Sequence, residues 1–139
     1  MKAVHTGAPI FCLILIISGC MAESKKTQEP VKAAWKISAA TDKRTYHSKQ
    51  TMWVNVTMES DQEGEAEIYI HGIKSGRQEH LRMRSNETIK SGFNMFAKKF
   101  RVPDCATCAG IQPGAYTVAV DARFQGEKRT VTLRVEVLQ

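Results

Sequence analysis

Residues 102–124 read VPDCATCAGIQPGAYTVAVDARF and contain a loop, a turn and a strand in succession. The loop carries Cys105 and Cys108, and the turn is the Pro-Gly pair that precedes Tyr116. From Tyr116 onward, apolar and polar side chains alternate with a period of two, which is typical of a strand that buries one face. We therefore expect a half-buried strand of an antiparallel sheet whose core-facing residues are Tyr116, Val118, Val120, Ala122 and Phe124.

The same alternation recurs along the rest of the chain. Residues 130–137 repeat it after a glycine-containing connection at residues 125–128, which predicts a β-hairpin. Other alternating runs, separated by polar or glycine-containing turns, cover residues 35–39, 52–59, 65–71, 78–83 and 93–102. A break is expected at residues 72–76. Lys98 shares the apolar side of its run, which indicates either an amine that reaches solvent from a buried stem or a bulge that shifts the register. Seven or eight short strands without a helical period predict an all-β protein, an antiparallel β-sandwich of two sheets.

Two short motifs resemble those of immunoglobulin-like (Ig-like) domains. PGAY at residues 113–116 resembles the turn into the penultimate strand, with Tyr116 in the place of a tyrosine-corner residue. DKRTY at residues 42–46 and the run after it resemble the first strands of bacterial and archaeal Ig-like surface modules, although His47-Ser48 stand where such modules often have Pro-Gly. The Cys…Trp…Cys spacing of antibody domains is absent from the sequence. The resemblance implies an Ig-like β-sandwich domain over residues 34–139, and by itself it implies no particular activity.

The first 19 residues have the features of an export signal. Lys2 supplies a positive charge, residues 10–17 form an apolar run too short to span a bilayer comfortably, and Ser18-Gly19 are the small residues that a signal peptidase accepts. ISGC at residues 17–20 resembles the lipobox of prokaryotic lipoproteins. That resemblance implies a diacylglyceryl group on the Cys20 thiol and cleavage immediately before it. The alternatives are an ordinary signal peptide that ends near a cysteine, or an uncleaved anchor.

Residues 20–33 are polar, mixed in charge and without periodicity. Such a composition predicts a flexible tether of roughly 20 Å rather than part of a packed domain. Together with the lipobox, it predicts an exported protein held at the cell membrane or outer membrane by a lipid on Cys20.

Three interpretations apply to the C-x-x-C pair of Cys105 and Cys108. In an exported protein, the simplest is a local disulfide that fixes the loop before Tyr116. A thioredoxin-like redox pair needs a helix after the first cysteine, which the glycines and proline of residues 109–114 disfavour. A metal site would use both thiolates and two further ligands, for which three histidines are available: His47, His71 and His80.

The remaining sequence features favour a surface domain without chemistry of its own. The formal net charge of +6 is scattered rather than blocked, so we expect no nucleic-acid partner. Asn55 and Asn86 begin N-x-T sequons and are possible glycosylation sites. No sequence motif of a nucleophile elbow, zinc protease or phosphate-binding loop is present, so we expect no enzyme, no catalytic residue and no cofactor.

These observations lead to two functional hypotheses. The first is a lipid-anchored cell-envelope protein whose Ig-like domain is a binding or structural module for an unknown protein or envelope polymer. The outward aromatic residues Trp53 and Tyr69 are its candidate binding surface. The alternative is an envelope lipoprotein that handles metal or redox chemistry at Cys105 and Cys108.

Overall fold

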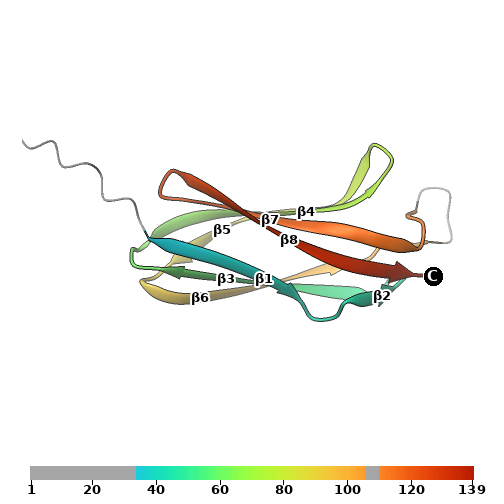
Figure 1. The fold of residues 1–139 in the computed structure, drawn as a ribbon, viewed down its shortest axis with the longest axis horizontal. Helices are drawn as coiled ribbons and strands as arrows, with labels where there is room; N and C mark the ends of the chain where they lie inside the picture. The colour runs from blue at the N-terminus through green and yellow to red at the C-terminus, as the bar shows by residue number, and fades with distance from the viewer. Residues whose placement is uncertain (1–33, 106–109) are drawn as a thin grey trace, which may run out of the picture. The chain divides into compact units, whose positions relative to one another are not determined.

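A computed structural model describes residues 34–105 and 110–139, and these contain eight β-strands and no helix (Figure 1). The strands are β1 (Trp35–Thr41), β2 (Thr45–His47), β3 (Thr51–Ser60), β4 (Gly64–Ser75), β5 (Gln78–Ile89), β6 (Gly92–Arg101), β7 (Gly114–Phe124) and β8 (Glu127–Leu138). All eight belong to one compact unit, Lys32–Gln139. Across these same residues, no helix is long and apolar enough to cross a bilayer. The predicted signal segment, Cys20 and the tether lie outside the described residues.

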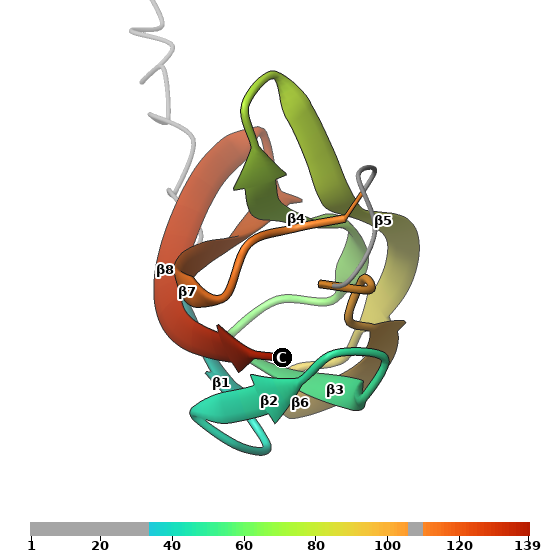
Figure 2. The same cartoon turned by 90° about the vertical axis from the view of Figure 1, so that its right-hand side faces the viewer.

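The strands form two sheets packed face to face, which confirms the predicted β-sandwich. One sheet has the order β1–β3–β6 and the other β2–β8–β7–β4–β5. Figure 2 looks along the strands and shows β8, β7, β4 and β5 curving over the three-stranded sheet. Every pairing is antiparallel except β2 with β8, because the chain leaves the first sheet after β1 and joins the second as β2. This arrangement is Ig-like.

The core is the set of inward residues that the period of two predicts. In β7, Val118, Val120, Ala122 and Phe124 are buried, while the inward residues of β8 are buried or half-buried. Buried apolar side chains come from every strand except β6, whose Phe96 and Phe100 are partly buried. At about 25 cal/mol per Å² of apolar area removed from water, this shared core is the main stabilising term of the fold.

Two tyrosines fix the corners of the sandwich. The Tyr116 hydroxyl donates to the carbonyl of Gln112, four residues upstream, which is the geometry of the predicted tyrosine corner. Tyr46, which is fully buried, donates to Asp42 Oδ1 at 2.6 Å and accepts from the amide of Lys43 at 2.9 Å. The same Asp42 oxygen accepts from the amide of Trp53 at 2.8 Å, so this corner joins the β1–β2 turn to β3.

The structure settles the two alternatives for Lys98 and corrects the expected break at residues 72–76. The register of β3 with β6 continues without interruption from Thr51 to Ser60, so Lys98 lies on no bulge. Its stem is half-buried between the sheets, and its amine pairs with the carboxylate of Glu87 on β5. The break expected at residues 72–76 is wrong in extent: β4 runs on to Ser75, and the turn is only Gly76-Arg77.

Gly72 explains why β4 can continue past this point. A methyl group on Gly72 would lie 2.2 Å from the carbonyl oxygen of Thr117, because the β4 and β7 backbones approach closely here. Ile73 then adopts a positive φ of 49°, which is rare for a branched side chain, and its side chain is buried. Gly72 and Ile73 both face the core, so the alternation of β4 shifts by one residue at this point. Lys74 and its cross-strand partner Glu79 therefore lie on the outer side of the sheet.

Candidate functional site

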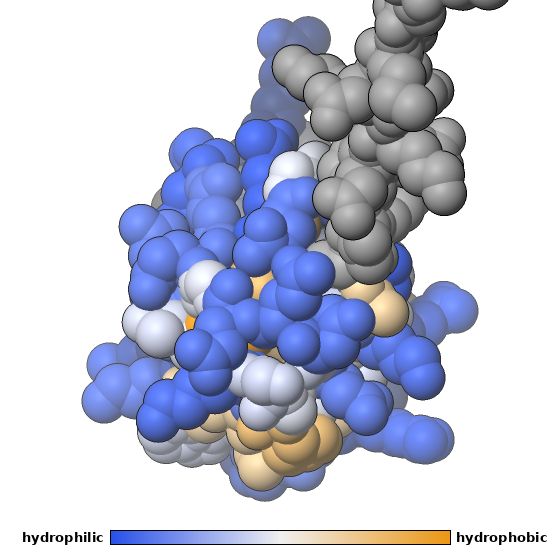
Figure 3. All heavy atoms as spheres, turned by 90° about the vertical axis from the view of Figure 1, so that its left-hand side faces the viewer, coloured by the Kyte–Doolittle hydropathy of each residue, from blue (hydrophilic) through white to orange (hydrophobic). Residues whose placement is uncertain are grey.

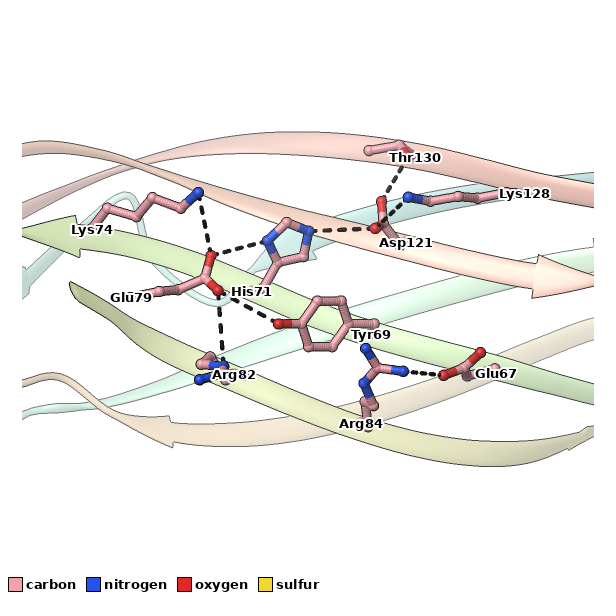
Figure 4. A network of polar contacts seen from close by, with 10 residues as sticks. All are labelled: Glu67, Tyr69, His71, Lys74, Glu79, Arg82, Arg84, Asp121, Lys128 and Thr130. Atoms are coloured by element: carbon pink, nitrogen blue, oxygen red, sulfur yellow. Dashed lines mark hydrogen bonds and ion pairs between the residues drawn. The ribbon is translucent and has the colours of Figure 1, made fainter. Parts of the chain in front are cut away.

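A network of polar side chains covers the outer face of the five-stranded sheet, and its centre is His71 on β4 (Figure 4). Tyr69 and His71 are alternate residues of β4 and point to the same side. Their rings stack, with centroids 4.6 Å apart and planes 12° from parallel. The stack fixes the orientation of the imidazole on an otherwise open face.

Two carboxylates face the two nitrogens of His71. Nδ1 lies 3.2 Å from Glu79 Oε1, and Nε2 lies 3.4 Å from Asp121 Oδ2 on β7. A protonated imidazole can donate to both carboxylates, whereas a neutral one can donate to only one of them. The carboxylates lie on opposite sides of the ring and do not converge on one point. Consistent with this, the described residues contain no group of three His, Cys, Asp or Glu side chains that could hold a metal ion.

Further partners keep both carboxylates ionised. Partial burial works against the charge of Asp121, but Lys128 at 2.8 Å and the Thr130 hydroxyl at 2.6 Å outweigh it and lower the pKa of Asp121 below its ordinary value. Burial likewise opposes ionisation of Glu79. The hydrogen bond with His71 and the charge of Lys74 outweigh it, so the pKa of Glu79 is also lowered. The network is therefore an ordered, charge-compensated surface.

Tyr69 is less available to a ligand than an outward aromatic residue on a bare sheet. The Arg84 guanidinium lies 4.5 Å from the centre of its ring and also pairs with Glu67 at 2.7 Å. With His71 stacked on the ring as well, Tyr69 is half-buried by its own neighbours. The predicted outward orientation of Tyr69 is confirmed, but its ring already has partners.

A hollow of about 420 Å³ lies beside the network, between the β4–β5 hairpin and β7. His71 and Lys74 form one wall, while the floor is made by the small outward residues of β7, Ala115, Thr117 and Ala119. A smaller hollow of about 210 Å³ lies on the other side of Tyr69, next to Arg84 and Asp121. This face can therefore receive polar groups in depressions whose walls are already ordered.

The other predicted surface residues lie elsewhere. Trp53 is 42% exposed, but it is on β3, so Trp53 and Tyr69 occupy opposite outer faces and form no common surface. Asn55 lies on the same outer face as Trp53 and is half-exposed, whereas Asn86 is exposed on β5. The two sequons are thus on different sheets.

One of the three histidines, His47, contacts the same C-terminal end of the domain as Cys105. Cys105 has no disulfide partner among the described residues; its Sγ lies 3.8 Å from the carbonyl oxygen of Leu138, and His47 Nδ1 lies 3.1 Å from that of Gln139. His71 belongs to the network above, and His80 is half-buried in β5. Cys108 lies outside the described residues, so its disulfide with Cys105 stays a prediction.

Sequence reasoning missed Glu79, Arg84 and Asp121 as members of this site. The alternation places Arg84 and Asp121 on outward faces, but only the order β7–β4–β5 makes these strands neighbours. A hairpin centred on Gly76-Arg77 would have predicted the pairing of Arg84 with Tyr69. Nothing in the local sequence indicates that Asp121 reaches His71.

Comparisons with known proteins place the fold and no more. No family model matches the chain, and no curated protein matches it. Among solved structures, a β-glucosidase from Erythrobacter marinus is similar over 76% of this chain and 16% of its own, at 9% identity and a TM-score of 0.59. The sporulation control protein Spo0M from Bacillus subtilis is similar over 75% of this chain and 49% of its own, at 19% identity and a TM-score of 0.52.

A third similar structure is a separate domain of about the same size. It is the CARDB domain of a Pyrococcus furiosus protein, solved in complex with di-metal ions, and it matches 76% of this chain and 93% of its own at 7% identity and a TM-score of 0.52. The chain thus spans only a small part of the glucosidase and nearly all of this domain. At these identities the likeness shows an Ig-like β-sandwich, a fold that fits a binding or structural module.

Proposed function

We propose that this chain is a lipid-anchored cell-envelope protein whose Ig-like domain is a binding module, and that its binding surface is the outer face of the five-stranded sheet. The observation that carries the proposal is the hollow of about 420 Å³ beside the His71 network. The His71 side of the hollow is held by the Tyr69 ring and two carboxylates before any ligand arrives, so binding loses less side-chain entropy there than on a surface of free side chains.

The chemistry of the hollow indicates what it can hold. Lys74, whose side chain is 65% exposed, offers an ammonium group at the rim, and Thr117 offers a hydroxyl on the floor. The floor otherwise consists of alanine methyl groups and backbone. A polar or anionic segment of an envelope polymer or of a protein fits such a site.

A substitution that fills the hollow tests the proposal. Ala119→Arg introduces a long side chain on the floor, and we expect it to abolish co-sedimentation of residues 34–139, which lack the proposed lipid anchor, with envelopes isolated from the cells that make the protein. Asn86→Arg adds the same group at the far end of the same face and should leave sedimentation unchanged. Equal binding by both variants, with unfolding midpoints like that of the wild type, would show that the hollow is not the binding surface.

The lipid anchor is proposed from residues 17–20 and has its own test. Cys20→Ala should release the protein from membranes, because it removes the thiol that the lipobox resemblance identifies as the acylation site. Membrane attachment that persists in this variant would contradict the anchor and leave the binding surface unaffected.

An envelope metal or redox lipoprotein is the second candidate. The observation in its favour is that His47 and Cys105 contact the carbonyls of adjacent residues, Gln139 and Leu138. A non-reduced intact mass separates the candidates. A loss of two hydrogens with no adduct indicates a disulfide between Cys105 and Cys108, whereas two thiols with a bound metal ion favour the metal site.

A further inference from the structure

The outer face of the three-stranded sheet is apolar where the five-stranded face is polar. Phe93 and Met95 on β6 are 68% and 63% exposed, and Trp53 on β3 is 42% exposed. In the part of the chain that the structure describes, these three are the large apolar side chains left exposed, and the register of β3 with β6 places all of them on this one face. A concentration of this kind on one face indicates a contact surface.

The charges on this face are nearly all positive. Its outward basic residues are Lys36, Lys99 and Arg101, and its one outward acid is Glu59. The residues between them, among them Ser38, Ala40, Thr57 and Ala97, carry no charge. Exposed aromatic and aliphatic groups among lysine and arginine are typical of surfaces that lie in the headgroup region of an anionic membrane. The five-stranded face, by contrast, balances its basic groups with carboxylates such as Glu67 and Asp121.

Phe93 and Met95 lie at the end of this face where the domain begins, whereas Trp53 lies toward its other end. Lys36 on β1 pairs with Glu59, which pairs in turn with Phe93, so Phe93 is two strand spacings, about 10 Å, from the first residues of β1. Figure 3 views this end of the domain and shows apolar residues gathered at its lower edge, where β6 begins. A lipid on Cys20, at the other end of a tether of roughly 20 Å, would keep this face within reach of the bilayer.

From this, and resting on the proposed lipid anchor, we propose that the domain lies on the membrane with the outer face of its three-stranded sheet against the lipid. Phe93, Met95 and Trp53 enter the interface between headgroups and acyl chains. Lys36, Lys99 and Arg101 contact the phosphates of anionic lipids. The occupant of this face is therefore a lipid surface and not a second copy of the chain.

The two tryptophans allow a direct test. The full chain, purified from the membranes of cells that express it, is reconstituted into vesicles of phosphatidylcholine and phosphatidylglycerol with brominated acyl chains. Trp35 is 2% exposed in the core, so quenching by bromine reports Trp53. We expect Trp53 to be quenched, and we expect Phe93→Ser combined with Met95→Ser to remove most of this quenching. Thr132→Ser, an exposed position of β8 on the opposite face and outside the hollow, is the control and should retain it.

The outcomes separate this inference from the anchor. The intact mass of the reconstituted chain shows whether Cys20 is acylated, independently of the fluorescence. A chain that floats with the vesicles but whose Trp53 is not quenched overturns the membrane-facing orientation and leaves the anchor standing. Shielding of Trp53 that rises with protein concentration in detergent, without lipid, also overturns it, because a second copy would then cover the face.

Discussion

Replacing Tyr46 by Phe removes one oxygen atom from the buried corner between β1 and β2, and we expect it to lower the free energy of unfolding by about 2 kcal/mol. The hydroxyl donates to the Asp42 carboxylate and accepts from the amide of Lys43. The ring itself stays buried in the variant. The change therefore isolates one charge-assisted hydrogen bond and one backbone amide that loses its acceptor.

The cost of Tyr46→Phe should change with pH in the alkaline range, because the Tyr46 hydroxyl ionises there. Burial, followed by the hydrogen bond with Asp42, raises the pKa of Tyr46 to about 12, whereas a tyrosine in the unfolded chain ionises near pH 10. Between these values the unfolded state binds fewer protons than the folded state, so the wild type loses stability as the pH rises, by about 3 kcal/mol in all. Tyr46→Phe has no proton to lose at this position. The stability difference between the two proteins should therefore shrink above about pH 10 and approach zero near pH 12.

Urea unfolding followed by the fluorescence of Trp35, at about pH 8, 10 and 11.5, measures this difference. The two proteins differ only at residue 46, so contributions from the rest of the chain cancel from the comparison. Tyr69→Phe is the matched control, because its hydroxyl is 3.5 Å from its partner and the variant should stay within about 0.5 kcal/mol of the wild type. A gap between wild type and Tyr46→Phe that is constant with pH would refute the linkage. No gap at pH 8 would refute the energetic role of the corner.

Three further changes test other parts of the structure by the same unfolding assay. Gly72→Ala should lower the free energy of unfolding by more than about 3 kcal/mol, because the added carbon would lie 2.2 Å from a backbone oxygen of β7. Gly76→Ala, which has open space around it, should lower it by only about 1 kcal/mol. Similar costs for the two variants would contradict the close approach of β4 and β7. Lys98→Met and Glu87→Gln should each lower the free energy of unfolding by about 1–3 kcal/mol, since each single change leaves a half-buried group without its partner. The double variant should lose less than the sum of the two single losses. Additive losses would contradict the ion pair. Asp121→Asn should weaken the fall in the free energy of unfolding at acidic pH. The lowered pKa of Asp121 stabilises the fold above about pH 4, and this stabilisation is lost as the pH falls further. An unchanged acid dependence in the variant would argue against this role of Asp121.

The sequence was sufficient to predict the layers of this fold and which side chains fill them. A period of two identifies the buried face of a strand without reference to its neighbours, and so Val118 and Val120 could be placed in the core in advance. Lys98 could not be settled in this way, because a snorkelling amine and a bulge produce the same pattern. Only its register with β3 and its contact with Glu87 decide between them.

The candidate site was harder to predict because it depends on strand order. His71 meets Asp121 only because β7 pairs with β4, and it meets Glu79 only because Ile73 reverses the alternation of its strand. Alternation specifies the side of a sheet but not the adjacent strand, and a positive φ at a branched residue is disfavoured locally and is set by packing. Both causes are tertiary, so a local pattern does not contain them.

The two proposed surfaces are compatible because they lie on opposite sides of one sandwich. If Trp53 and Phe93 rest against lipid, the hollow at Ala119 must face away from the membrane, since the two sheets are packed face to face about 10 Å apart. A partner in the envelope could then reach the hollow while the anchor and the three-stranded sheet hold the domain down. Ala119→Arg should therefore abolish partner binding and leave the quenching of Trp53 by brominated lipid intact. Loss of both in this one variant, with the fold preserved, would mean that the two faces do not act separately and that at least one of them is assigned wrongly.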